Sequence, residues 1–138
     1  MISFNYETDF LLDKEDETSS WISKTISEEG FTEDEINYVF CNDAYLHKLN
    51  VEFLNHDTLT DIISFDYSIG KIIQGDIFIS IERVADNSKE FSVSFEEELK
   101  RVIIHGILHY CGYKDKTNAD AMVMRDKENY YLNKLIKN

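Results

Sequence analysis

Two histidines and one aspartate, His105, His109 and Asp115, have the residue types and the spacing needed to bind a metal ion. Histidines four residues apart lie on the same face of an α-helix. Gly112 can end that helix, because glycine adopts the left-handed conformation without a Cβ penalty, and the chain can then bring Asp115 beside the two rings. Two imidazoles and one carboxylate leave coordination positions open, as catalytic metal sites do. The tract therefore predicts a metal-dependent enzyme.

The spacing H-x3-H-x2-G-x2-D also limits the chemistry. It is similar to the pattern H-E-x-x-H-x-x-G-x-x-H of the metzincin proteases, with Asp115 at the position of their third histidine. Gly106, however, stands where those proteases carry the glutamate that acts as general base. We therefore expect a metal hydrolase other than a protease, in which metal-activated water attacks the substrate. Hydrolysis of a peptide or of a small phosphoester is kept as an alternative hypothesis.

The elements that position this tract can be predicted from periodicity and capping residues. Ser94 and Glu97 form a capping box at the start of the helix that carries both histidines. Strands are predicted at residues 2–6, 36–41, 61–67 and 75–81, with a turn beginning at 32–35 and a hairpin turn at 68–71. Helices are predicted at residues 15–29, 43–54, 82–91, 95–111 and 118–136. This pattern predicts one α+β domain with a mixed four-stranded sheet packed against about five helices.

The periodicity of two predicted helices also indicates which of their residues pack against the rest of the protein. For residues 43–54 we expect four inward-facing side chains: Ala44, Leu46, Leu49 and Phe53. For residues 118–136 we expect four packing residues: Met122, Tyr130, Leu132 and Leu135.

The composition is that of a soluble protein with an uneven charge distribution. The 138 residues carry a formal net charge of −13, but residues 97–138 hold eight Lys/Arg and six Asp/Glu. An acidic protein has little non-specific affinity for nucleic acid, so an RNA substrate would need a local patch or a partner. No apolar run approaches the roughly 20 residues of a membrane span, and no secretory signal is expected. Cys41 and Cys111 are expected to be free thiols, and the expected location is the cytoplasm.

Several short segments of the chain resemble motifs of one known family, and they occur in the same order as in that family. The tract around the histidines resembles the YbeY endoribonuclease signature H-G-x-L-H-x-x-G-Y-D-H, and six positions match it: His105, Gly106, Leu108, His109, Gly112 and Tyr113. Residues 60–65 resemble the family's T-D-V-L-S-F, and residues 75–80 resemble G-D-I-x-I-S. Leu49 and Asn50 match the L-N that precedes them.

This resemblance implies a single endoribonuclease domain over residues 1–138. It implies one divalent metal ion, with Zn²⁺ as the expected ion, and metal-dependent cleavage of RNA. It also implies a part in ribosomal RNA maturation, including the small-subunit 3′ end, and in ribosome quality control. The implied partners are ribosomal RNA and the small ribosomal subunit, with neither DNA nor a membrane expected.

The chain departs from the family pattern at two places. Asp115 replaces the third histidine, and the added negative charge makes iron, manganese or nickel alternatives to zinc. Leu54 stands where the family motif L-N-x-x-Y-R has arginine. Lys114 and Lys116 are candidate replacements for that cation, or else solvated loop lysines. Ser64 is a weaker candidate for substrate binding.

Two further side chains are candidates near the predicted site. Asp61 is a candidate for orienting a ligand or, alternatively, for a fourth metal ligand. His56 is a possible proton donor. The rival hypotheses are a ribosome-associated assembly factor with weak or vestigial nuclease activity, and a metal that only staples the end of the helix.

Overall fold

The four strands form one mixed sheet in the order β1-β2-β4-β3. The computed structural model describes residues 1–54 and 60–136. The strands are β1 (Ile2–Tyr6), β2 (Thr32–Cys41), β3 (Ile62–Asp66) and β4 (Ile72–Ser80). β1, β2 and β4 are parallel, whereas β3 pairs antiparallel with β4 through the predicted hairpin. The α+β class with a mixed four-stranded sheet is confirmed.

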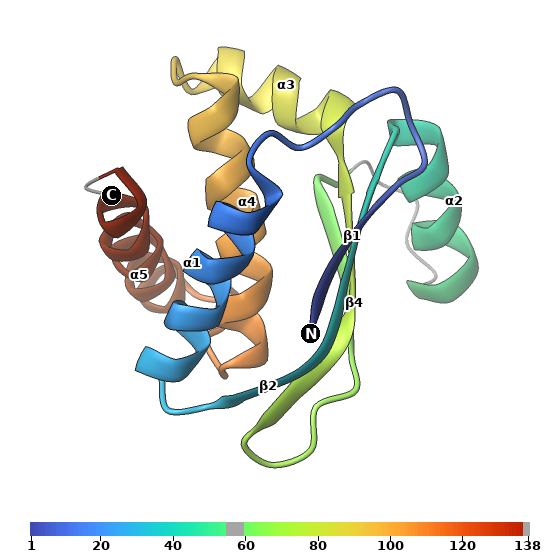
Figure 1. Cartoon of the computed structure of the whole chain (residues 1–138). Helices are drawn as coiled ribbons and strands as arrows, with labels where there is room; N and C mark the ends of the chain where they lie inside the picture. Colours follow the sequence, from blue (N-terminus) through green and yellow to red (C-terminus); the bar gives the residue numbers. More distant parts are fainter. Residues whose placement is uncertain (55–59, 137–138) are drawn as a thin grey trace.

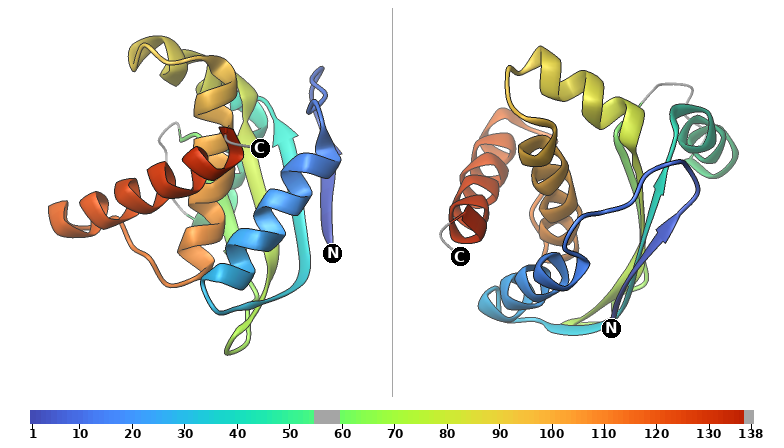
Figure 2. Two further views of the ribbon diagram at one scale, coloured as in Figure 1. Left: turned by 60° about the vertical axis from the view of Figure 1, so that its left-hand side comes forward. Right: turned by 45° about the horizontal axis from the view of Figure 1, so that its top comes forward.

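Within residues 1–54 and 60–136, five helices pack around the sheet, and they cover its two faces unequally (Figure 1). They are α1 (Glu15–Glu28), α2 (Asp43–Leu54), α3 (Ile81–Glu90), α4 (Phe95–Tyr110) and α5 (Asn118–Ile136). α1, α4 and α5 lie on one side of the sheet and α2 on the other (Figure 1). α5 crosses the outer side of α4 (Figure 2, left). α4 is therefore enclosed between the sheet and α5, and it is the central helix of the fold.

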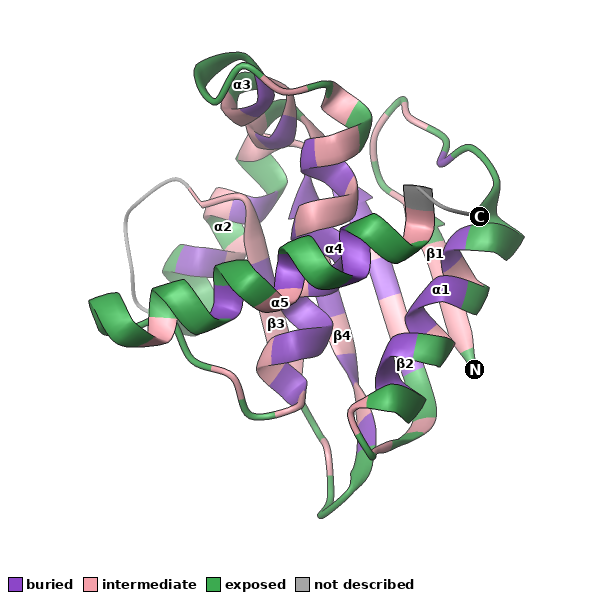
Figure 3. Cartoon of the chain, turned by 90° about the vertical axis from the view of Figure 1, so that its left-hand side faces the viewer, coloured by how far each residue is buried: buried purple, intermediate pink, exposed green. Residues whose placement is uncertain are grey.

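The main core lies between the sheet and α1 and α4, as the buried stripe along α4 in Figure 3 shows. Alternate residues of β2 and β4 face this core, because successive side chains of a strand point to opposite faces. Tyr38 is fully buried there, and its hydroxyl donates a hydrogen bond of 2.9 Å to the carbonyl of Ile103 in α4. A second, smaller cluster of Cys41, Leu46 and Ile63 lies under α2.

Local signals fix both ends of α4. The Ser94 side chain accepts a hydrogen bond from the Glu97 backbone N–H at 3.0 Å, which confirms the predicted cap. At the other end Gly112 has φ of +100°. Its N–H bonds to the His109 carbonyl, and the Tyr113 N–H bonds to the Leu108 carbonyl. These two bonds make a Schellman motif, which satisfies carbonyls at the helix end and reverses the chain toward Asp115.

The sequence predictions for the start of β2 and for the packing of α2 were wrong in part. The predicted turn at 32–35 is the start of β2, where a register shift between Glu33 and Ile36 interrupts the pairing with β4. On α2, Ala44 and Phe53 are exposed, and the buried residues are Leu46 and Asn50. The reason is that α2 packs on the sheet only through a narrow stripe.

The inward face of α5 also differs from the prediction. Met122 and Tyr130 are exposed, whereas Met124, Glu128 and Tyr131 are buried. Both cysteines are free, as expected, and Cys111 is only partly buried. Among the described residues, no helix is both long and apolar enough to span a lipid bilayer.

Candidate metal centre

The three predicted ligands come together at the C-terminal end of α4. His105 and His109 lie one turn apart, with ring centroids 4.5 Å from each other. One oxygen of Asp115, Oδ2, lies 3.4 Å from His105 Nε2 and 3.6 Å from His109 Nε2. Potential donor atoms of all three residues lie within 4.8 Å of one another. The turn after Gly112 therefore brings the Asp115 carboxylate beside the two imidazoles, as the sequence predicted.

The spacing of these three atoms suits a small tetrahedral ion. Ligand atoms about 2.0–2.1 Å from a tetrahedral zinc ion lie about 3.3–3.4 Å from one another. The two distances from Asp115 Oδ2, 3.4 and 3.6 Å, are close to that edge length. Side chains of both histidines and of Asp115 are partly exposed to solvent, so an ion could enter and retain an open position. The residues present thus fit a divalent metal held by two nitrogens and one oxygen.

Each histidine ring is held through its other nitrogen. His105 Nδ1 lies 2.7 Å from Oε2 of Glu128, a buried residue of α5. His109 Nδ1 lies 2.9 Å from the backbone carbonyl of Tyr113. Since both acceptors bear no proton, each Nδ1 carries the hydrogen and each Nε2 presents its lone pair toward Asp115. Partners of this kind fix the orientation of metal-binding histidines and raise their basicity.

Glu128 is a residue of the candidate site that the sequence analysis missed. Its second oxygen, Oε1, accepts a hydrogen bond of 3.0 Å from Arg101 Nη1, so the carboxylate links a cation of α4 to the His105 ring. The sequence does contain a signal for it, because Met124, Glu128 and Tyr131 lie on one face of α5 at helical spacing. A charged residue within an otherwise buried stripe must have a partner.

The charges at the site shift its pKa values in opposite directions. Burial alone would lower the pKa of His105, but Glu128, Asp115 and Asp61 together raise it above its ordinary value. Burial and the neighbouring His105 charge lower the pKa of His109. Burial raises the pKa of Glu128, and the hydrogen bonds from His105 and Arg101 outweigh this, so the net shift is downward. Glu128 therefore remains ionised beside His105.

Asp61, the predicted orienting residue, lines a cavity together with His105 and Asp115 but lies outside the ligand group. Its Oδ2 accepts a hydrogen bond of 3.4 Å from Asn87, and burial raises the pKa of its carboxyl. Among the described residues, the carboxylates and imidazoles that converge closely enough to share an ion do not include Asp61. The role of orienting His105 through a hydrogen bond falls to Glu128.

The remaining residues that the sequence analysis singled out lie on several elements. Lys114 and Lys116 are exposed on either side of Asp115. Ser64 is half-buried on β3, opposite Ile77 of β4. Leu54 is 42% exposed at the end of α2. His56 lies outside the described residues.

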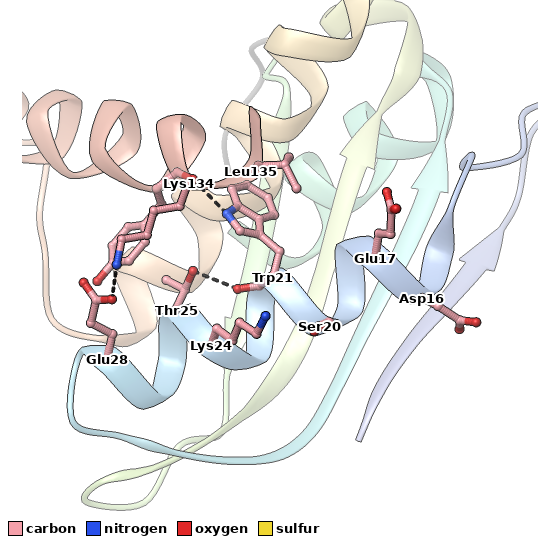
Figure 4. Close-up of a pocket in the computed structure, with 10 residues that line it drawn as sticks. Asp16, Glu17, Ser20, Trp21, Lys24, Thr25, Glu28, Lys134 and Leu135 are labelled. Atoms are coloured by element: carbon pink, nitrogen blue, oxygen red, sulfur yellow. Dashed lines mark hydrogen bonds and ion pairs between the residues drawn. The ribbon is translucent and has the colours of Figure 1, made fainter. Parts of the chain in front are cut away.

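Two cavities differ in their relation to the metal ligands. The larger, of about 710 Å³, lies between α1 and α5 and is lined by residues such as Trp21, Lys24 and Tyr131 (Figure 4). None of its lining residues belongs to the candidate metal group. The smaller cavity, of about 280 Å³, is lined by His105 and Asp115. The cavity that matters for chemistry at the metal centre is therefore the smaller one.

Comparisons with known proteins agree with this geometry. A sequence model of the family described as "Endoribonuclease YbeY" matches residues 3–136. A protein of Flavobacterium johnsoniae with that name is 68% identical over 128 residues, which is 93% of this chain and 92% of the relative. One of Flavobacterium psychrophilum is 61% identical over 96% of this chain and 94% of the relative.

A solved structure supports the same relationship at the level of the fold. The solution structure of a Thermotoga maritima protein superimposes with a TM-score of 0.70 at 25% identity, covering 98% of this chain and 89% of that one. Since the family match spans nearly the whole chain and the relatives are highly identical, this chain belongs to the YbeY endoribonuclease family.

Proposed function

We propose that residues 1–138 form one metal-dependent endoribonuclease domain that hydrolyses phosphodiester bonds in RNA. One observation carries the proposal: both Nε2 atoms face a single oxygen of Asp115 while both Nδ1 atoms are engaged elsewhere. Such an arrangement is built for an ion with open positions. The name of the closely similar relatives, endoribonuclease, supports RNA as the substrate.

In this mechanism His105, His109 and Asp115 hold one divalent ion, with Zn²⁺ as the proposed ion. Glu128 and the Tyr113 carbonyl keep the two rings in the ligating orientation. A divalent ion bound there would supply water of lowered pKa and positive charge to offset the charge that builds on the phosphate. The exposed Lys114 and Lys116 would contact neighbouring phosphates, with a weaker contribution from Ser64.

The proposed role in the cell is maturation of ribosomal RNA, including the small-subunit 3′ end, together with ribosome quality control. The proposed partners are ribosomal RNA and the small subunit, and the proposed location is the cytoplasm. The acidic surface supports a role for partners, because a net charge of −13 gives little non-specific attraction to RNA.

The test is cleavage of a structured small-subunit ribosomal RNA fragment by the pure protein, with and without added divalent ions. A His109→Ala sample, purified identically, is the control. We expect metal-dependent cutting by the wild type only. Equal cutting by both samples would indicate a contaminating ribonuclease. No cutting by either, with folded protein and added metal, would reject the nuclease as an independent activity.

A second candidate function is a ribosome-associated assembly factor with weak nuclease activity. The observation that favours it is Leu54, a partly exposed apolar side chain at the position of the arginine in the family motif. This hypothesis predicts that His109→Ala protein binds small-subunit particles as tightly as the wild type and supports their assembly. Hydrolysis of peptides is the least favoured alternative, because Gly106 is buried against Ile62 and Ile77 and provides no carboxylate.

A further inference from the structure

The cavity of about 280 Å³ beside the metal centre combines three kinds of surface. His105 and Asp115 line one part of it, so it is continuous with the proposed site of cleavage. The end of α3 contributes Asn87 and Phe91, and two arginines, Arg101 and Arg125, come from α4 and α5. An aromatic ring, polar groups and a guanidinium next to a catalytic metal are the groups that bind a nucleotide.

Phe91 is the aromatic surface of this cavity. It follows the last residue of α3, and its side chain is 54% exposed although it lines the cavity. Its backbone is fixed, because its N–H bonds to the Asn87 carbonyl at 2.9 Å and the following Ser92 has φ of +57°. The backbone thus places Phe91 at the cavity, and the protein leaves about half of its side chain uncovered. An exposed aromatic face in such a place is a stacking platform for a base.

The two arginines differ in exposure and in the strength of their ion pairs. Arg101 is only 14% exposed. Its guanidinium donates to the Glu128 carboxylate at 3.0 Å and lies 3.9 Å from the Glu97 carboxylate. Arg125 is 56% exposed, and its contact with Glu128 is long, at 3.9 Å. The guanidinium of Arg101 is therefore committed to the network behind His105, whereas Arg125 can turn its planar fork toward a phosphate.

The carboxyl groups of the cavity restrict where a phosphate can lie. Asp61 and the buried Glu98 line the cavity together with Asn87. Negative charge there repels a phosphate but can accept hydrogen bonds from the amino and imino groups of a base. A nucleotide would therefore place its base toward Asn87 and Phe91 and its phosphate toward Arg125.

We propose that this cavity is a nucleotide subsite of the metal centre, in which Phe91 stacks on one base of a single-stranded RNA segment and Arg125 contacts an adjacent phosphate. The proposal rests on the RNA-cleaving function proposed above. It assigns substrate binding to the C-terminal end of α3 and to the first half of α5, at two exposed side chains outside the candidate ligand group.

The test uses the zinc-loaded protein and a fluorescent single-stranded oligonucleotide from the 3′ end of small-subunit ribosomal RNA. Four variants are compared with the wild type: Phe91→Ala, Phe91→Trp, Arg125→Gln and, as a control, Lys24→Gln. Lys24 is an exposed cation of α1 that lines the other cavity. Fluorescence anisotropy gives affinity, and initial rates give KM and kcat. Zinc affinity and thermal unfolding of each variant show whether the ligand group and the fold are intact.

We expect Phe91→Ala to weaken RNA binding about tenfold and to raise KM, and Phe91→Trp to restore both, since stacking requires an aromatic ring. Arg125→Gln should weaken binding and reduce the slope of log K against log salt by about 0.7, the value for one lost phosphate contact. Lys24→Gln should behave like the wild type. Zinc affinity should be unchanged in all four variants.

The outcomes separate this proposal from the nuclease function. RNA binding that depends on Phe91 and Arg125 but leads to no cleavage would support the subsite and reject the nuclease. Cleavage that is indifferent to both substitutions, with KM within twofold of the wild type, would overturn the subsite and retain the nuclease. Equal loss of binding in Phe91→Ala and Phe91→Trp, or no RNA binding by the wild type, would also overturn the subsite.

Discussion

The two histidines of the candidate metal centre lie one helical turn apart but are held by different kinds of structure. His109 is held locally, by the carbonyl of Tyr113, which the Schellman motif at Gly112 brings back to the end of its own helix. His105 is held over a long range, by a buried carboxylate of the last helix that is itself paired with Arg101. One ligand thus depends on the end of a helix, and the other on the packing of α5 against α4.

Because of this difference, the local half of the site, at His109, and the long-range half, at His105, can be disrupted in different ways. A backbone carbonyl cannot be removed by substitution, so the His109 side is perturbed only through the conformation of the turn. The Glu128 carboxylate can be removed, and the largely enclosed Arg101 and His105 would then lose the acceptor that they share. The long-range half is therefore expected to be the more fragile of the two.

Replacement of either histidine should have the largest effect on metal binding, and the effect should be the same for both. We expect His105→Ala and His109→Ala each to reduce bound zinc from about one ion per chain to nearly none, because two ligands rarely retain the ion in competition with a chelator. Zinc content after dialysis, measured by mass spectrometry, tests this. Thermal unfolding of the metal-free proteins is the control. Retention of zinc by either variant would contradict the assignment of that histidine.

Replacement of Glu128 should show the fragility of the long-range half. Glu128→Ala leaves Arg101 and His105 without their acceptor, and breaking a buried ion pair costs about 3–5 kcal/mol. Loss of an orienting partner typically weakens metal binding by about 10–100-fold. Glu128→Gln retains a carbonyl acceptor and should recover part of the metal affinity. Urea unfolding of the metal-free protein and zinc competition measure the two effects, and an unchanged zinc affinity in Glu128→Ala would refute the orienting role.

A change in the turn should perturb the local half by a smaller amount. Gly112→Ala places a Cβ in a left-handed conformation with φ of +100°, at a cost of about 1–2 kcal/mol. Because the turn carries the Tyr113 carbonyl, zinc affinity should fall as well. Gly70→Ala, in the β3–β4 hairpin with φ of +58°, is the matched control. It should lose stability and keep its zinc affinity, and equal zinc affinities in the two variants would show that the turn does not position His109.

The smallest effect is expected from a change of pH. It acts on Glu29, whose carboxylate accepts a hydrogen bond from the Tyr113 hydroxyl. The Glu29 carboxylate accepts hydrogen bonds from the Tyr113 and Tyr131 hydroxyls and from Lys127. Burial raises the pKa of Glu29, and these bonds outweigh it, so the net pKa lies below the ordinary value of 4.5. A lowered folded-state pKa gives stability that is present above pH 4.5 and is lost as the pH falls through the folded-state value.

The measurement is urea unfolding of the wild type and of Glu29→Gln between pH 3 and 7. The wild type should lose more stability on acidification than the variant does. Parallel curves for the two proteins would show that Glu29 does not contribute to this pH dependence.

The same contrast between local and long-range structure explains what the sequence could predict. The histidine pair, the cap at Ser94 and the turn at Gly112 depend on residues within a few positions of one another, and their spacing was sufficient. The contact between His105 and Glu128 spans 23 residues and depends on how α5 crosses α4, which periodicity does not specify. The same holds for the pairing of β2 with β4 and for the start of β2 at Thr32.

The side chains that pack α5 illustrate the limit most clearly. Met122 and Tyr130 are apolar or aromatic and were expected to be buried, yet both face solvent. Glu128 is charged and was not considered, yet it is buried at the centre of the interface. The burial of a charged side chain is decided by the partners that meet it, and here those partners, Arg101 and His105, lie on another helix.

α5 follows all three candidate ligands in the sequence, and this order has a consequence for synthesis. A nascent polypeptide that has left the ribosome only as far as residue 115 already contains His105, His109 and Asp115, but neither Glu128 nor Arg125. The three candidate ligands thus emerge before the carboxylate that contacts His105 through Nδ1. Until α5 has emerged and packed on α4, the ring of His105 lacks this acceptor, whereas the turn that supports His109 is close to its own helix in the sequence. The order of synthesis therefore separates the two supports in time.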